Sequence, residues 1–234
     1  MTKIVFIHGS GDSARIWRLQ TDSLGPERAI AIDLPGHGQR ADTLPAEVTV
    51  LDYARAAHEI ITRELQLDSP IIAGHSLGGA IALMMALEYA AELSGLVLIG
   101  TGARLRVHPK LLEDARQTPQ QARVQLSELA VAPTHTTLPQ NLLQEQPASA
   151  PTMLYRDLAA CDVFDVMARL PQITLPALIL CGADDRLTPV KYSQYLRQHL
   201  AGSALRVIPD AGHYVMREQP QIVNEALVEW AQHL

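Results

Sequence analysis

Short apolar runs recur along the chain, with longer segments of mixed polar and apolar character between them. Runs of three or four residues without a polar position are typical of strands that are buried on both faces, as in a parallel sheet. Such runs occupy residues 4–7, 29–32, 71–73, 96–99 and 177–180, and a sixth apolar stretch lies at 205–208. Only the last run contains a charge, Arg206, which favours a place at the edge of the sheet.

Amphipathic segments separate these runs, most clearly at 51–67 and 220–234, and they predict helices. Alternation of strands and helices predicts a parallel sheet with helices on both faces. A chain of 234 residues suits one such domain better than two. We therefore predict an α/β fold with about six parallel strands.

The stretch from 103 to 170 interrupts this alternation, because it contains prolines and no convincing strand. Since proline is tolerated in the first turn of a helix but not further in, the stretch predicts several short helices between the fourth and fifth strands. We expect residues 1–102 and 171–234 to form the core and 103–170 to form a helical insert. Its seven basic and seven acidic residues cancel, so the insert would not select substrates by bulk charge.

Composition excludes several classes of partner. The formal net charge is −6 and no basic run occurs, so nothing indicates nucleic acid or an anionic membrane surface. No apolar run reaches the length of a signal peptide core or a membrane helix. The only cysteines, Cys161 and Cys181, have neither metal-like nor redox-like spacing, which favours reduced thiols in a cytoplasmic protein. We expect a small-molecule substrate.

One motif carries chemistry: Gly74-His75-Ser76-Leu77-Gly78 follows the run at 71–73 and precedes a helical stretch at 80–89. A sharp turn from strand to helix exposes a serine hydroxyl, and flanking glycines remove side chains that would collide there. This pattern predicts Ser76 as a nucleophile.

A serine hydroxyl needs an adjacent base, and His213 follows the last predicted strand. An acid is expected to hold that histidine in place. Two adjacent candidates, Asp184 and Asp185, follow the fifth apolar run.

Together these motifs resemble the α/β-hydrolase superfamily, in its serine esterase- and lipase-like branch with a helical cap. The family places its acid three residues after a glycine, so the segment 182–189 implies Asp185, in the chain order serine, aspartate, histidine. The segment 33–38 is similar to a family turn that we interpret as structural, fixed by Asp33 and His37. The insert at 103–170 corresponds to the cap.

The resemblance implies the α/β-hydrolase fold, with one departure. Family members usually carry two antiparallel strands before the first strand of this chain, and we expect these to be absent. The strand at 28–32 would then be exposed at one edge of the sheet, where a second copy can pair. We expect a monomer or a homodimer.

The negative oxygen of an acyl-transfer intermediate needs preorganised N–H donors. One is the backbone N–H of Leu77, and the resemblance implies the backbone N–H of Ser10 as the other, with Gly11 as the alternative. Side chains that flank the catalytic loops or lie in the insert are candidates for the substrate pocket: Trp17, Met153, Leu154, Phe164, Leu187 and Tyr214.

A serine nucleophile favours an acyl-enzyme and hence hydrolysis of a small or medium apolar ester. Two alternatives stay open: a C–C bond hydrolase of a diketone-like metabolite, and a ligand receptor on a hydrolase scaffold. The first would need a polar patch in the insert that binds a carboxylate, for which Arg104, Arg106, Arg123 and Arg156 are candidates. The mechanism needs no cofactor and no metal, and the glycines at 9–11 lack the further residues of a dinucleotide site.

Overall fold

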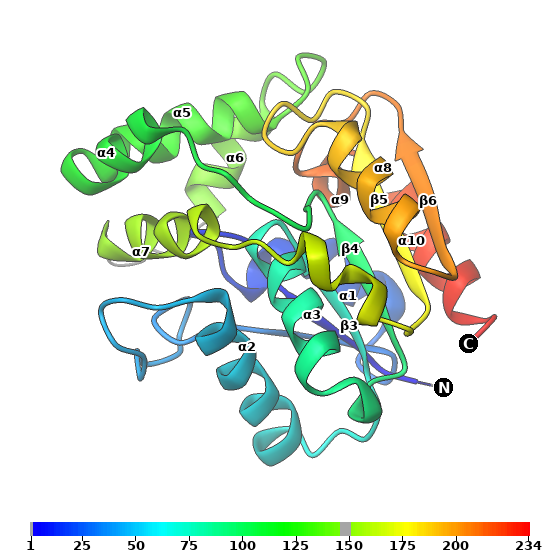
Figure 1. Cartoon of the computed structure of the whole chain (residues 1–234). Coiled ribbons are helices and arrows are strands. Elements are labelled where there is room, and N and C mark those ends of the chain that lie inside the picture. The colour runs from blue at the N-terminus through cyan, green and yellow to red at the C-terminus, as the bar shows by residue number, and fades with distance from the viewer. Residues whose placement is uncertain (1, 146–150) are drawn as a thin grey trace.

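The computed structural model describes residues 2–145 and 151–234. Within these residues, six strands form one parallel sheet in the order β2-β1-β3-β4-β5-β6 (Figure 1). The strands are β1 (Ile4–Ile7), β2 (Ala29–Ile32), β3 (Ile71–His75), β4 (Gly95–Ile99), β5 (Ala177–Gly182) and β6 (Ser203–Ile208). Each predicted apolar run is a strand, and the predicted α/β-hydrolase fold is confirmed.

The edges of the sheet also lie where the sequence predicts them. The strand that contains Arg206, β6, forms one edge, and β2 forms the other. Pairing of the β2 edge with a second copy of the chain stays a proposal.

Helices cover both faces of the sheet, which explains why every predicted run except the one in the edge strand β6 lacks polar positions. Successive residues of β1 belong to different apolar clusters: Val5 and Ile7 pack toward one face, and Ile4 and Phe6 toward the other. The first cluster includes residues of α2 (Val50–Glu59), α3 (Leu77–Glu88) and α8 (Val190–His199); α1 (Arg18–Leu24), α9 (Val215–Glu218) and α10 (Pro220–Ala231) lie on the other side. Short helical turns complete this part: η1 (Ala14–Trp17), the π-turn η2 (Ile60–Glu64), η3 (Ala90–Glu92) and η4 (Met167–Gln172).

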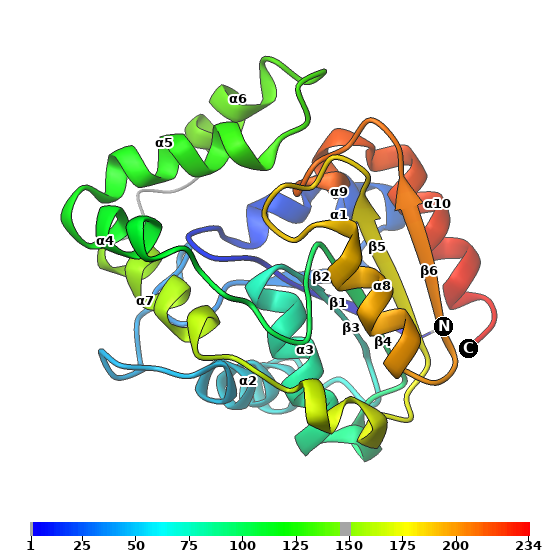
Figure 2. The same ribbon diagram turned by 45° about the horizontal axis from the view of Figure 1, so that its top comes forward.

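The predicted helical insert is present between β4 and β5. It consists of α4 (Pro109–Gln117), α5 (Pro119–Ala130), α6 (Leu138–Glu145) and α7 (Pro151–Asp162), while residues 146–150 lie outside the described residues. Prolines stand in the first turn of α4 and α5, as the sequence predicts. The insert lies over the ends of the strands marked by their arrowheads (Figures 1 and 2), so it covers the edge at which the loops after the strands meet.

The helices and the two cysteines bear on expectations drawn from composition. Within the described residues, the helices are too short or too polar to cross a membrane. Cys161 and Cys181 are buried and form no disulfide, and burial raises the pKa of the Cys161 thiol to about 12.

Candidate active site

Ser76 lies on a sharp turn between β3 and α3, and its backbone is strained. Its φ is 53° and its ψ is −114°, a conformation that a residue with a side chain rarely adopts. Two hydrogen bonds hold the turn: the Ser76 N–H donates to the carbonyl of Ile99 (3.0 Å), and the Thr101 hydroxyl donates to the carbonyl of Ser76 (2.8 Å). The neighbouring strand therefore fixes the strained residue.

The glycines around Ser76 are required by the close approach of backbone to backbone. A Cβ on Gly74 would lie 2.0 Å from the carbonyl oxygen of Gly78, and a Cβ on Gly78 would lie 2.3 Å from that of Ile7 on β1. Both distances are far below van der Waals contact. The turn, as the sequence indicates, can form only with glycine at these positions.

His213 and Asp185 meet beside this turn. His213 Nδ1 lies 2.9 Å from Asp185 Oδ2, whereas Asp184 is exposed. The Asp185 carboxylate also accepts hydrogen bonds from the Leu187 N–H (2.9 Å), the Thr188 N–H (2.8 Å) and the Thr188 hydroxyl (2.7 Å). Burial alone would raise the pKa of Asp185, but His213 and these hydrogen bonds outweigh burial and lower it. The carboxylate is therefore ionised at neutral pH.

The loop that carries His213 is held from two sides. The His75 Nε2 donates to the carbonyl of His213 (3.0 Å), and burial together with His213 lowers the pKa of His75 well below its usual value, so His75 is neutral. From the insert, the carbonyl of Ala130 accepts the His213 N–H (2.6 Å). Glu218 accepts the N–H of Gly212 (2.8 Å), and these contacts together fix the His213 backbone.

The two backbone amides predicted to bind an oxyanion lie on either side of Ser76. Leu77 is the first residue of α3, where a helix leaves its N–H groups without internal partners. Ser10 lies in a turn closed by a hydrogen bond from the Asp12 N–H to the carbonyl of Gly9 (3.3 Å). A Cβ on Gly9 would lie 3.2 Å from the Ser76 Cβ, so this turn packs directly against Ser76.

Of the two alternative donors in that turn, Gly11 is already engaged. Its N–H donates to Asp157 Oδ2 on α7, at 2.9 Å. The Ser10 N–H is thus the better candidate. At the base of the turn, neutral His8 accepts the Leu34 N–H and donates to the carbonyl of Gly9, and burial together with His37 lowers the His8 pKa to about 4.

A cavity of about 430 Å³ brings the predicted groups together between the strand ends and the insert. Ser10, Ser76 and His213 line it on the core side. The apolar side chains that the insert contributes are Leu105, Val107, Leu111, Leu126, Leu129, Ala130 and Leu158, and its polar ones are Arg106, His108, Lys110, Asp114 and Gln125. Of the predicted pocket residues, Leu187 and Tyr214 line the cavity.

The other four predicted pocket residues are not among the described residues that line the cavity. Trp17 is buried and stacks on Phe6, with ring centroids 4.7 Å apart. Phe164 belongs to the core, and Leu154 packs within the insert. Met153 is buried with its sulfur against Gly36. Packing therefore accounts for these four side chains.

These residues occur in a fold that known proteins share. A family model described as "Alpha/beta hydrolase family" matches residues 4–226. This chain belongs to the alpha/beta hydrolase family.

Alpha/beta hydrolases similar to this chain include proteins named for different acyl substrates. A relative from Cronobacter turicensis, named "Putative carbamate hydrolase RutD", is 29% identical over 96% of this chain and 88% of its own length. A solved structure titled "Structure of a thermophilic esterase" is 33% identical with a TM-score of 0.83, over 100% of this chain and 90% of that chain. Another, "Est816 as an N-Acyl homoserine lactone degrading enzyme", is 27% identical with a TM-score of 0.86, over 98% and 93%.

Several residues that hold the site escape the motif analysis. An aspartate in a turn commonly binds the N–H two residues on, here that of Leu187, and Thr188 follows directly and donates both its N–H and its hydroxyl to Asp185. Asp33 fixes its turn as expected, accepting the N–H groups of Ala14 and Gln39, but His37 also reaches the insert and contacts Asp157. The one feature of the sequence that could have indicated a role for Asp157 is its charge among apolar positions of a helix.

Proposed function

We propose that this hydrolase cleaves carboxylic esters of small or medium apolar acids through an acyl-enzyme on Ser76. The observation that carries the proposal is the convergence of Ser76 and His213 on one cavity, with His213 Nδ1 2.9 Å from the ionised Asp185. A histidine held in this way by a carboxylate has its other ring nitrogen available to accept a proton.

In the proposed cycle, His213 Nε2 takes the hydroxyl proton as Ser76 attacks the carbonyl carbon of the ester. Asp185 holds the Nδ1–H and stabilises the imidazolium that forms. The backbone N–H groups of Leu77 and Ser10 bind the negative oxygen of the tetrahedral intermediate. His213 then returns the proton to the leaving alcohol, and a water molecule activated by His213 hydrolyses the acyl-enzyme.

The cavity supports an apolar substrate of limited size. Its volume of about 430 Å³ lies at the lower end of the range for small-molecule sites, roughly 300–1,000 Å³. Leucines from α4, α5 and α7 line the part formed by the insert: Leu111, Leu126, Leu129 and Leu158. The relatives' names add lactones and carbamates to the esters to be tested, because all three present a carbonyl carbon to the same attack.

The arginines give little support to a C–C bond hydrolase. Arg156 is buried and paired with Asp42 at 2.7 Å, and Arg104 lies 3.8 Å from Asp165. Arg106 alone of the four candidates is among the described lining residues, and its guanidinium donates to the carbonyl of Asp162. Two other cations line the cavity and are also engaged: Lys110 pairs with Asp114 at 3.0 Å, and Arg186 donates to the carbonyls of Glu128 and Val131. The ester therefore remains the favoured substrate.

The first test is turnover of p-nitrophenyl esters of increasing acyl length, with a lactone and an aryl carbamate in the same panel. We expect a maximum at a short or medium chain and a loss of about 10⁶-fold in kcat for Ser76→Ala, as for removal of a nucleophile in other serine hydrolases. Ser23→Ala, at an exposed serine on α1, is the matched control and should behave as the wild type.

Two outcomes would contradict the proposal. One is a folded wild type with no turnover of any ester, which would favour the receptor if an apolar ligand still binds in the cavity. The other is Ser76→Ala with undiminished turnover.

A further inference from the structure

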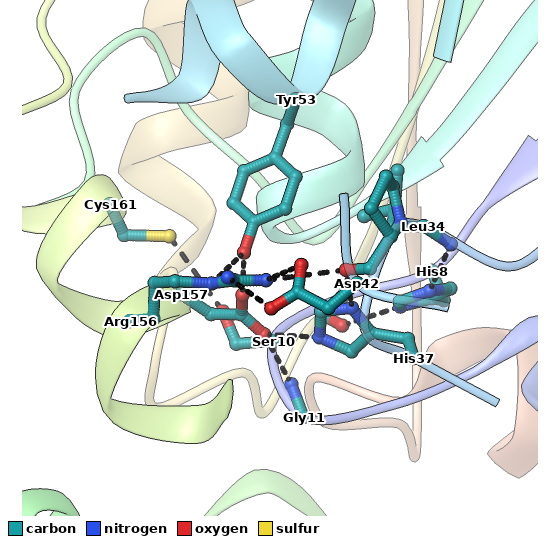
Figure 3. Close-up of polar contacts among 12 residues, drawn as sticks. His8, Ser10, Gly11, Leu34, His37, Asp42, Tyr53, Arg156, Asp157 and Cys161 are labelled. Atoms are coloured by element: carbon teal, nitrogen blue, oxygen red, sulfur yellow. Dashed lines mark hydrogen bonds and ion pairs between the residues drawn. The ribbon is translucent and has the colours of Figure 1, made fainter. Parts of the chain in front are cut away.

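Asp157, on α7 of the insert, is fully buried against the turn that we assign to the oxyanion hole. Its Oδ2 accepts hydrogen bonds from the Gly11 N–H (2.9 Å) and from His37 Nε2 (2.9 Å). Its Oδ1 accepts the hydroxyl of Tyr53 at 2.5 Å. Figure 3 shows the carboxylate among these groups, which come from two core loops and α2. The carboxylate thus joins the insert to the core through three donors.

The contact with the turn is made by one face of α7 rather than by Asp157 alone. Leu154, Asp157 and Cys161 are spaced three and four residues apart, which places them on one side of a helix. A Cβ on Gly11 would lie 3.2 Å from Leu154, and the Cys161 sulfur lies 3.8 Å from the Ser10 hydroxyl (Figure 3). Three successive turns of the helix therefore hold two adjacent residues of the loop.

The charge on Asp157 is maintained despite its burial. Burial alone would raise the pKa of Asp157, but attraction to His37 and the hydrogen bonds outweigh burial and lower it. Burial likewise opposes the charge on His37, and Asp157 overcomes it and raises the His37 pKa. Arg156 faces the same cluster, and its Nε donates to the Tyr53 hydroxyl (3.2 Å). An ionised carboxylate accepts the Gly11 N–H more strongly than a neutral acceptor would.

The position of the Gly11 N–H bears directly on Ser10. The peptide between Ser10 and Gly11 is planar, so a bond to its N–H fixes the orientation of that unit. The Ser10 N–H belongs to the preceding peptide, which meets this unit at the Ser10 Cα, so holding the Gly11 N–H limits the rotation that would turn the Ser10 N–H away. Gly11 has a φ of +68°, the left-handed region in which glycine pays no steric penalty, and this leaves its backbone few restraints of its own. The bond to Asp157 therefore supplies a restraint that the glycine lacks.

From this geometry we propose that Asp157 is a positioning residue of the hydrolase. It holds the Gly9–Asp12 turn so that the Ser10 N–H faces the oxygen that becomes negative during attack by Ser76. The inference rests on the proposed function, and the alternative is that Asp157 only ties the insert to the core.

The test compares Asp157→Asn with Tyr53→Phe in the full chain. Both variants remove part of the same buried cluster, but Tyr53→Phe leaves the carboxylate on the Gly11 N–H. Loss of one oxyanion donor costs roughly 10²–10³-fold in kcat, and a displaced donor costs less, so we expect Asp157→Asn to lower kcat about tenfold or more. KM should stay near the wild-type value, because the interaction forms only in the transition state. Tyr53→Phe should keep kcat within about threefold of the wild-type value.

A second measurement follows the loop without turnover. In hydrogen exchange, the Gly11 N–H should be protected in the wild type and in Tyr53→Phe, and should exchange at least tenfold faster in Asp157→Asn. If Asp157→Asn does not fold, Leu154→Ala takes its place, because it loosens the same face of α7 without touching a buried charge.

The outcomes separate the inference from the proposed function. Equal losses of kcat in the two variants, or faster exchange of Gly11 with unchanged kcat, would assign Asp157 a purely structural role and overturn the inference. An inactive wild type would overturn the proposed function. The hydrogen-exchange measurement would still test the inference, because an unchanged exchange rate of the Gly11 N–H in Asp157→Asn would mean that Asp157 does not hold the turn.

Discussion

At the scale of single residues, hydrogen bonds distinguish Asp185 from the adjacent Asp184. Asp185 contacts His213 and accepts three further hydrogen bonds from Leu187 and Thr188, whereas Asp184 points toward solvent. We expect Asp185→Asn to lower kcat by about 10⁴-fold, since the amide cannot hold the Nδ1–H of His213 in the same way.

The matched control for this prediction is Asp184→Asn, whose kcat should equal that of the wild type. Steady-state kinetics of both variants on one ester is sufficient. A larger loss in Asp184→Asn than in Asp185→Asn would contradict the assignment of the acid.

Only some of the residues at the site belong to sequence motifs. Ser76 and His213 were predictable because each follows a strand at a fixed place in a recognisable pattern. Leu154 and Asp157 contact the site from a helix whose docking depends on contacts more than a hundred residues apart in the chain, such as that between Gly11 and Asp157. No local pattern encodes such a contact, so packing decides it.

At the scale of elements, the turn from β3 to α3 depends on contact between backbones. We expect Gly78→Ala to destabilise the fold by at least about 2 kcal/mol, because the added methyl group would meet the carbonyl of Ile7 on β1 and the helix must shift. Urea unfolding followed by circular dichroism measures this change.

Gly202→Asn is the control for the turn. Gly202 has a φ of +72° and open space around it, and asparagine tolerates that conformation better than other side chains. Its free energy of unfolding should stay within about 0.5 kcal/mol of the wild-type value. Comparable losses in both variants would mean that general backbone strain, rather than the contact with β1, limits the turn.

The strands themselves were predictable to within one or two residues, because burial on both faces removes polar positions from them. The helices of the insert were predictable as a group from their prolines. Their arrangement was not, since it depends on which side chains meet across α4, α5 and α7. This explains why Leu187 and Tyr214, on core loops, line the cavity, while Met153 and Leu154, on α7, lie against Gly36 and Gly11 and are not among its described lining residues.

At the scale of the whole molecule, the ion pair between His37 and Asp157 joins the core to the insert and makes stability depend on pH. The pKa of His37 is raised from 6.5, so its contribution is complete below about pH 6.5 and is lost as the pH rises through the raised value. The pKa of Asp157 is lowered from 3.8, so its contribution is present above that value and is lost as the pH falls through the lowered one. Their joint contribution is therefore largest in mildly acidic solution.

His37→Gln tests this dependence, because glutamine can still donate to Asp157 but cannot become charged. The free energy of unfolding, measured in urea between pH 4 and pH 9, should differ most from the wild-type value between about pH 4 and pH 6.5, and the difference should shrink at higher pH. Arg156 and Asp42 face the same cluster and are present in both proteins. His8 also faces it, and because His37 helps to lower the His8 pKa to about 4, His8 adds its own difference at the acidic end of this range. A difference that is constant over this range would mean that His37 is neutral in the folded protein. The insert would then be joined to the core at this point by neutral hydrogen bonds from His37 rather than by an ion pair.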